Sequence, residues 1–310
     1  MNPIKNPPPS LDMFHTLLDF LRWGISQMNA HAVYFGHGTD NSEDEAMLML
    51  ATTLHLSYPI NPEYLHARLT QEEKAALIAI FQRRIQERVP VPYLINKAWF
   101  AGLEFYVDER VLIPRSPVAE LIEQGFSPWV EPMEVHRILD LCTGSACIAI
   151  ACAYAFPEAH VDAVDISKDA LAVADKNVRH HGCEDSLSLW ESDLFSHLPS
   201  DSRYDIIISN PPYVSDEEFS GLPPEYHHEP AMALLTQKGS PDGLEIVNQI
   251  LKQAKHYLNP KGILVVEVGN SQEALVQRYP DAPFLWLDFE KGGDGVFLLT
   301  AEQLNQIEVV

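Results

Sequence analysis

The fold is decided by the stretch Val135-His-Arg-Ile-Leu-Asp-Leu-Cys-Thr-Gly-Ser-Ala-Cys-Ile-Ala-Ile-Ala-Cys-Ala-Tyr-Ala-Phe156. The β-rich run at 135–141 predicts a strand, and the apolar run at 146–156 predicts a buried helix after a short loop. A second strand at 160–166 and a second helix at 168–181 follow directly. Strands that alternate with helices in this way predict a parallel sheet with helical crossovers.

The same alternation continues to the end of the chain. Further strands are predicted at 187–190, 204–209, 262–268, 284–288 and 296–300, with a further helix at 244–258. The last two strands enclose Glu290-Lys-Gly-Gly-Asp-Gly295, which predicts a terminal antiparallel hairpin. Together with the first two, these strands make a seven-stranded sheet. We therefore expect an α/β, Rossmann-like domain over residues 116–310.

The N-terminal part has a different pattern. Apolar residues recur at helical spacing over 10–29, 42–56 and 70–88, which predicts helices. We place helix starts near Asp12 and near Thr70. The second is supported by Thr70-Gln-Glu-Glu73, which has the capping-box pattern that satisfies free amide donors. An N-terminal helical subdomain over residues 1–95 follows.

A linker is predicted between these two parts. Residues 97–113 contain two β-rich runs with Asp108-Glu-Arg110 between them, which predicts a β-hairpin linker over residues 96–115. In the segment Pro114-Arg-Ser-Pro117, Ser116 can cap a helix that begins at Pro117. Arg115 would then lie at the mouth of any site beyond it.

Charge and composition limit the classes of function. The chain has 310 residues, 21 basic and 44 acidic, and a net charge of −23. This balance repels phosphate backbones, so no direct DNA binding is expected, and it favours a cationic protein partner. The alternative interpretation of the charge is ordinary solubility. The apolar run at 146–156 is far shorter than the roughly 18 residues of a membrane span.

The N-terminus lacks the apolar core of a secretory signal, so we expect a cytoplasmic protein without a membrane segment. The four cysteines form no Cys-x-x-Cys pair, and His180-His181 and His227-His228 lack zinc-type ligand spacing. We therefore expect reduced cysteines and no metal.

A cofactor site is predicted at the carboxyl ends of the strands, where open parallel sheets bind ligands. In the first loop, Asp140-Leu-Cys-Thr-Gly-Ser145, Gly144 allows close approach of the backbone and the helix start at Ser145 offers free amide donors. The Gly-x-Gly-x-x-Gly pattern of nicotinamide binding is absent. The predicted cofactor-binding residues are Asp140, Cys142, Thr143, Gly144, Ser145, Asp165, Ile166, Asp193, Leu194 and Asn210.

Two acidic residues have specific expected roles in this site. Asp165 ends the second strand, where a carboxylate can accept hydrogen bonds from both hydroxyls of a ribose. Asp193 follows the third strand, where a carboxylate can accept the exocyclic amine of adenine while Leu194 and Ile166 pack against its faces. The alternative for Asp193 is a loop residue that caps a turn.

The most specific motif follows the fourth strand, at Asn210-Pro-Pro-Tyr213. The two prolines restrict the backbone and leave carbonyl oxygens without local partners. The Asn210 side-chain oxygen and the Pro211 carbonyl can accept both hydrogens of one planar NH2 group, while Tyr213 covers its face. A plain turn is the alternative, but its position at a strand end of a ligand-binding sheet favours catalysis by Asn210, Pro211, Pro212 and Tyr213.

These residues resemble the HemK/PrmB family of protein glutamine methyltransferases, and the resemblance covers the whole chain. It is carried by Asn210–Tyr213, by the segment Pro114–Pro117 and by Glu225-Tyr-His-His-Glu-Pro230. The family implies a class I fold that uses S-adenosyl-L-methionine (SAM) to methylate the N5 nitrogen of a glutamine side chain, with the N-terminal subdomain recognising the substrate. The resemblance implies substrate contacts from Arg115, Ser116, Asn210, Tyr213 and Glu229.

Within the family, Arg115-Ser-Pro117 is similar to the branch that modifies ribosomal protein three of the large subunit. The resemblance to this branch extends to Leu141–Ser145, His228–Pro230 and Gly292–Phe297. A basic ribosomal protein as substrate agrees with the net charge of −23. The alternative within the family is methylation of peptide chain release factors, whose enzymes tend to have Arg-Pro at this position.

Two other functions stay open. Adenine-N6 methylation of nucleic acid needs the same grip on a planar NH2, but the acidic charge opposes it. A non-catalytic cofactor-binding module is motivated by Ala146, which stands where the family commonly has glycine. Alanine costs little at the start of a right-handed helix and is strained in a left-handed conformation.

Overall fold

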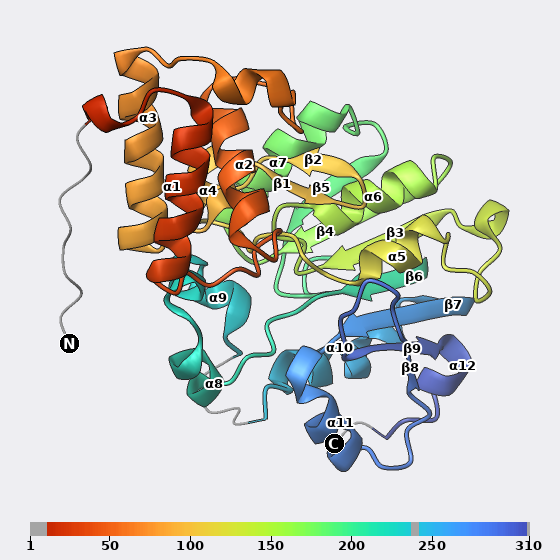
Figure 1. Cartoon of the computed structure of the whole chain (residues 1–310). Helices are drawn as coiled ribbons and strands as arrows, with labels where there is room; N and C mark the ends of the chain where they lie inside the picture. Colours follow the sequence, from red (N-terminus) through yellow and green to blue (C-terminus); the bar gives the residue numbers. More distant parts are fainter. Residues whose placement is uncertain (1–10, 237–241, 309–310) are drawn as a thin grey trace. The chain divides into compact units, whose positions relative to one another are not determined.

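The chain folds as two units (Figure 1). The computed structural model describes residues 11–236 and 242–308. Unit one consists of Met1–Lys97 together with Pro223–His228, and unit two consists of Ala98–Leu222 and Glu229–Val310. The sequence-based division places residues 223–228 in the second domain, whereas they pack within the first unit.

Unit one is helical, as its apolar spacing predicts. It contains α1 (Leu17–Ala30), α2 (Ser42–Thr53), α3 (Gln71–Gln82), a π-helix (Arg83–Glu87) and α4 (Val91–Ile95), with 3-10 helices at Leu11–Met13 and Pro62–His66. The predicted start near Asp12 is wrong, because the capping box that begins α1 is formed by Thr16 and Asp19. The box at Thr70 is confirmed: Thr70 N donates to Glu73 Oε2 at 2.7 Å, and Glu73 N donates to Thr70 Oγ1 at 3.2 Å.

The core of unit one is formed by side chains from its three main helices, among them Phe20, Met28, Leu50, Leu77 and Phe81. Gly24 lets α1 approach α3 closely, because a Cβ atom there would lie 2.2 Å from Cε1 of Phe81. Four charged residues are also buried in the described part of this unit: Glu45, Lys74, Arg84 and Glu225.

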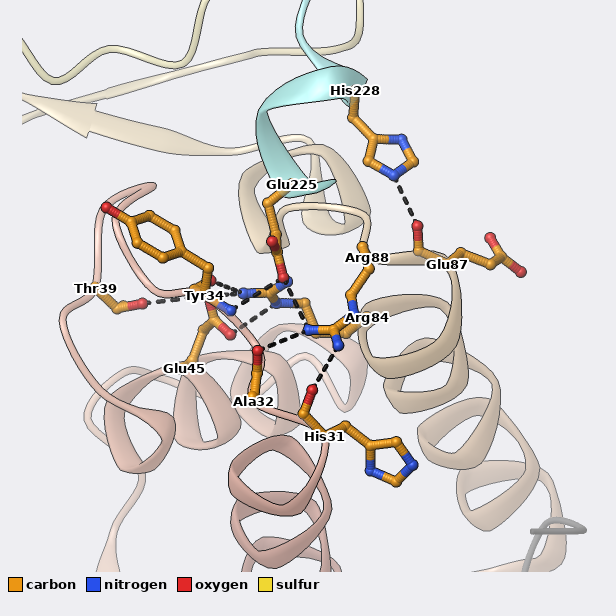
Figure 2. A network of polar contacts seen from close by, with 10 residues as sticks. All are labelled: His31, Ala32, Tyr34, Thr39, Glu45, Arg84, Glu87, Arg88, Glu225 and His228. Atoms are coloured by element: carbon orange, nitrogen blue, oxygen red, sulfur yellow. Dashed lines mark hydrogen bonds and ion pairs between the residues drawn. The ribbon is translucent and has the colours of Figure 1, made fainter. Parts of the chain in front are cut away.

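The segment Pro223–His228 is held in unit one by a buried carboxylate, as Figure 2 shows. Oε1 of Glu225 accepts hydrogen bonds from Tyr34 N at 3.0 Å and from Nη1 of Arg88 at 3.2 Å, and Nη1 of Arg84 lies at 3.4 Å. Arg84 also binds Glu45, with Nε to Oε2 at 2.8 Å and Nη2 to Oε1 at 3.1 Å. The buried guanidinium therefore has two carboxylate partners.

Unit two begins with the hairpin of β1 (Ala98–Phe100) and β2 (Leu103–Phe105). The hairpin turns at Ala101 and Gly102, both with positive φ, as two-residue hairpin loops require. The chain does turn at Asp108–Arg110, where Val111 N donates to the Asp108 carbonyl at 3.1 Å, but the expectation that this turn joins the two strands of the hairpin is wrong. The segment after Phe105 forms no strand up to Arg115. Asp108 instead closes a local loop by accepting Arg110 N at 3.1 Å and Arg110 Nε at 2.9 Å.

The predicted seven-stranded sheet is confirmed, with strand order β5-β4-β3-β6-β7-β9-β8. The strands are β3 (Arg137–Leu141), β4 (His160–Asp165), β5 (Leu187–Glu191), β6 (Tyr204–Ser209), β7 (Leu258–Glu267), β8 (Leu285–Trp286) and β9 (Val296–Thr300). All pairs from β5 to β7 are parallel, while β9 is antiparallel to both of its neighbours, which confirms the terminal hairpin. The order reverses at β3, between β4 and β6, and such a switch point opens a ligand crevice.

Helices cover both faces of the sheet. They are α5 (Val118–Glu123), α6 (Cys147–Ala155), α7 (Lys168–His181), α10 (Glu245–Ala254), α11 (Gln272–Arg278) and α12 (Ala301–Leu304). Alternate strand residues enter two separate cores: Ile138 and Ile206 pack with α5 and α6, whereas Leu139 and Ile207 pack with α10. Short helices α8 (Asp216–Gly221) and α9 (Ala231–Leu234) lie in the long connection after β6. Across the described ranges, none of the helices has the length and apolar character to span a membrane.

Candidate active site

A cavity of about 430 Å³ opens in unit two beside the carboxyl ends of β4 and β6. Eight residues predicted to bind the cofactor or act in catalysis line it: Cys142, Gly144, Asp165, Ile166, Asp193, Leu194, Asn210 and Pro212. The segment Ala231–Thr236, which includes α9, supplies further lining residues that the sequence reasoning did not single out. Its contribution is mainly apolar, and Met232 is largely exposed.

Asp165 is held rigidly at the end of β4. Its Oδ2 accepts Gly144 N at 2.9 Å, and its Oδ1 accepts Ser167 N at 2.9 Å. Each oxygen keeps a further lone pair, so the carboxylate can still accept two hydroxyl donors. Burial raises the pKa of Asp165, and the backbone donors oppose that shift.

Three other predicted cofactor residues lie beneath the cavity rather than on its surface. Asp140 is fully buried, and its Oδ2 accepts the hydroxyl of Thr143 at 2.5 Å and Ala149 N at 3.2 Å. Burial raises the pKa of Asp140 to about 7. The carbonyl of Ser145 accepts Nδ2 of Asn177 at 2.9 Å. Asp140, Thr143 and Ser145 therefore shape the loop from within.

The loops around the cavity are held in left-handed backbone conformations. Gly144 has φ 56°, and the non-glycine residues Cys142, Ala146 and Leu194 have φ values of 60°, 63° and 46°. Ala146 therefore has the left-handed conformation in which an alanine is strained, at a cost of roughly 1–2 kcal/mol. Such conformations persist only where the surroundings impose them.

The tetrapeptide Asn210–Tyr213 lies where β6 meets the cavity. Asn210 and Pro212 line the cavity, and Pro211 is buried. The Tyr213 hydroxyl donates to Oε1 of Glu267 at 3.0 Å, while Oγ of Ser271 donates to the Tyr213 carbonyl at 3.1 Å. The tyrosine is thus fixed at both its side chain and its backbone.

Residues predicted to contact substrate form polar contacts with Glu229 and Glu267. Arg115 forms an ion pair with Glu229 at 2.9 Å, and Glu229 also accepts Ile113 N at 3.1 Å. Ser116 donates to Oε2 of Glu267 at 2.5 Å, and helix α5 begins at Val118 rather than at Pro117. Glu229 is thus committed to holding Arg115 and the segment before it.

Glu267 was missed by the sequence reasoning. It ends β7, and the only local signal is a carboxylate at the end of the apolar run Gly262–Val266. Its contacts come from residues remote in sequence, which a strand pattern cannot show. No group of three or more His, Cys, Asp or Glu side chains that could hold a metal occurs in the described part of the chain.

Comparison with known families and structures agrees with this architecture. Residues 126–241 match the family model described as methyltransferase small domain. The solved structure of the hMettl16 catalytic domain in complex with a MAT2A 3'UTR hairpin has a TM-score of 0.50 and 18% sequence identity, and it covers 82% of this chain and 91% of that chain. At this identity the likeness concerns the fold alone.

Two relatives are similar over nearly their whole length. The ribosomal protein uL3 glutamine methyltransferase of Francisella tularensis subsp. tularensis is 46% identical over 295 residues, which are 95% of this chain and 93% of the relative. The protein of the same description from Bordetella pertussis is 45% identical over 291 residues, 94% of this chain and 96% of the relative. The chain therefore belongs to the family of ribosomal protein uL3 glutamine methyltransferases.

Proposed function

We propose that this chain transfers the methyl group of SAM to the side-chain nitrogen of a glutamine in ribosomal protein uL3. The observation that carries the proposal is the Asn210–Tyr213 tetrapeptide at the edge of the cavity, in a chain 46% identical to a uL3 glutamine methyltransferase. The names of the relatives supply the substrate class, and the cavity supplies a place for the cofactor beside the tetrapeptide.

The residues that line the cavity fit this cofactor. Asp165 offers two oriented acceptors for the ribose hydroxyls, and Gly144 allows its backbone close to the ligand. Ile166 and Met232 line the cavity with largely exposed side chains and can enclose a flat base. Asp193 lines the same cavity and can accept the amine of that base.

The tetrapeptide fits the acceptor. An amide nitrogen shares its lone pair with the carbonyl group and is a poor nucleophile. Bound SAM supplies an electrophilic methyl carbon on a sulfonium. The Asn210 side-chain oxygen and the Pro211 carbonyl accept hydrogen bonds from the two N–H groups of the amide. These bonds help to localise the lone pair and aim it across the cavity, so positioning and fixed dipoles account for the rate acceleration. No strong base is required, because the nitrogen loses its proton readily once it is alkylated.

We further propose that the helical unit, residues 1–95, recognises the protein substrate. The net charge of −23 gives the chain a field that attracts a basic ribosomal protein and opposes direct binding of DNA. Ribosomal proteins are made and assembled in the cytoplasm, and we place the reaction there.

The proposal is tested by offering labelled cofactor in parallel to undermethylated ribosomal proteins, to a release factor and to naked nucleic acid. Label is expected in uL3, with mass spectrometry locating one methylated glutamine. Label in the release factor alone would assign the chain to the other branch of the family, and label in nucleic acid alone would assign it to adenine methylation.

A further inference from the structure

Glu267 is a buried carboxylate in direct contact with the reactive tetrapeptide. Its residue is 6% exposed, and it ends β7 directly after the buried apolar run 263–266. Oε1 accepts the Tyr213 hydroxyl at 3.0 Å, and Oε2 accepts the Ser116 hydroxyl at 2.5 Å. A carboxylate at this depth is costly unless its hydrogen bonds are satisfied, and both oxygens here have a donor.

The Tyr213 ring is also constrained from below. A Cβ atom at Gly269 would lie 2.6 Å from Cε2 of Tyr213, so the ring packs directly on the glycine backbone. A Cβ atom at Gly295 would in turn lie 2.3 Å from the Gly269 carbonyl oxygen. These glycines allow the Tyr213 ring to pack directly on the backbone, and the hydrogen bond to Glu267 fixes the direction of the Tyr213 hydroxyl.

The same carboxylate acts on Asn210. Burial raises the pKa of Glu267, while hydrogen bonding from Ser116, Tyr213 and the Asn210 side chain, together with the charge of Arg115, lowers it. Because a carboxylate can only accept, an Asn210 amide that approaches Glu267 must turn its NH2 group toward the carboxylate and its Oδ1 away from it. An Asn210 amide turned the other way would present donors to the donors of a substrate amide.

We propose that Glu267 is a positioning residue for methyl transfer, which orients the Asn210 amide and the Tyr213 ring toward the acceptor nitrogen. This inference rests on the proposed function. Glu267 itself does not touch the reacting atoms: it acts through the acceptor geometry of Asn210 and through the ring that covers the acceptor amide.

The test is Glu267→Gln, because glutamine keeps the size of the side chain but adds a donor that competes with the Asn210 NH2. Displacing a reacting group by about 1 Å can cost on the order of 100-fold, and we expect kcat on uL3 to fall by roughly 10- to 100-fold. KM for uL3 and the cofactor Kd measured by calorimetry should stay near the wild-type values. Glu273→Gln, an exposed glutamate on the neighbouring helix α11, is the matched control and should behave as the wild type.

The pH profile separates positioning from a structural role. Protonated Glu267 is a donor, so kcat of the wild type should fall on the acid side as pH drops through the raised pKa of Glu267. Among the described residues, the charged or titratable groups that act on Glu267 are Arg115 and Tyr213. Glu267→Gln should lack this acid limb.

Wild-type kcat in Glu267→Gln, or a loss of cofactor affinity that parallels the loss of kcat, would overturn the inference. If Glu267→Gln does not fold, Tyr213→Phe takes its place, because it removes the same hydrogen bond and leaves the carboxylate in position. Unchanged kcat in Tyr213→Phe would then overturn it. A wild-type chain that methylates no ribosomal protein would instead refute the proposed function.

Discussion

Single residues divide the work between binding the cofactor and presenting the acceptor. Asp165 and Asn210 line one cavity, but they stand at the ends of different strands, β4 and β6. Asp165 is held by two backbone donors, and Asn210 is the first residue of the tetrapeptide Asn210–Tyr213. Substitutions at these two positions should therefore affect different measurements.

Asp165→Ala should mainly weaken cofactor binding. The change removes two hydrogen bonds between a charged acceptor and the ribose hydroxyls, each worth about 1.5–3 kcal/mol, so the Kd for SAM should rise by roughly 100- to 10,000-fold. Turnover at saturating cofactor should fall much less. Calorimetry of cofactor binding measures the effect, and an unchanged Kd would move the ribose site away from β4.

Asn210→Ala should have the opposite signature. It removes one of the two acceptors for the substrate amide, so we expect turnover to fall by on the order of 100-fold, the size found for loss of one preorganised polar group. Cofactor affinity should change little, because the carboxylate of Asp165 is untouched. Single-turnover kinetics on uL3 measures the rate, and wild-type turnover would remove Asn210 from the mechanism.

Asp140 provides a prediction about stability and pH. Its pKa is raised from the usual 3.8 to about 7 in the folded chain, so the folded state binds this proton more tightly. The contribution of Asp140 to stability is then largest below about pH 4 and is lost as pH rises through 7. The unfolding free energy of the wild type minus that of Asp140→Asn should fall by about 1.4 kcal/mol per pH unit across this window. A pH-independent difference in urea unfolding would contradict it.

Regular strands and helices could be predicted from the sequence, whereas turns and element boundaries were predicted less accurately. The seven strands were predicted from β-rich runs, because burial on both faces leaves apolar residues at nearly every position of a parallel strand. The hairpin turn was misplaced because Asp108–Arg110 has turn composition, while the positive φ values of Ala101 and Gly102 decide the turn.

The loop between β3 and α6 gives a prediction at this scale. Gly144 and Ala146 both have positive φ, and a Cβ atom at Gly144 would meet nothing within 4 Å. Gly144→Ala therefore adds only backbone strain, and we expect the free energy of unfolding to fall by about 1 kcal/mol.

Ala146→Gly is the matched variant for this loop. It relieves similar strain but loses a buried methyl group, worth about 0.8 kcal/mol. It also raises the conformational entropy of the unfolded chain. Its stability should change little. Thermal unfolding compares the two variants, and equal destabilisation of both would argue against a strained backbone at Ala146.

At the scale of the whole molecule, the chain crosses between its units three times, after Lys97, after Leu222 and after His228. The segment between the last two crossings is fixed in unit one by Glu225, in a network that joins residues far apart in sequence. Neither this network nor the contacts of Glu267 could be predicted, because single-sequence patterns report local structure and burial but not which distant polar residues meet. Deleting residues 1–97 would remove the partners of Glu225.

Glu225→Gln should destabilise unit one. It weakens charged hydrogen bonds to Arg84 and Arg88, and we expect a loss of about 2–3 kcal/mol. A larger loss is not expected, since Glu45 still neutralises the buried Arg84 and Arg88 remains partly exposed. Glu87→Gln is the control, because its ion pair with Arg83 is exposed and such pairs contribute at most about 1 kcal/mol. Similar melting temperatures for the two variants would mean that the buried network contributes little.

The central claim is that rigid oxygen acceptors at the end of β6 hold a flat amide toward the methyl carbon. A crystal structure of the chain with S-adenosylhomocysteine and a glutamine peptide from uL3 measures this directly. We predict the side-chain nitrogen of the glutamine within hydrogen-bond distance of Asn210 Oδ1 and of the Pro211 carbonyl, facing the cofactor sulfur. A glutamine bound in that complex away from residues 210–213 would contradict the account.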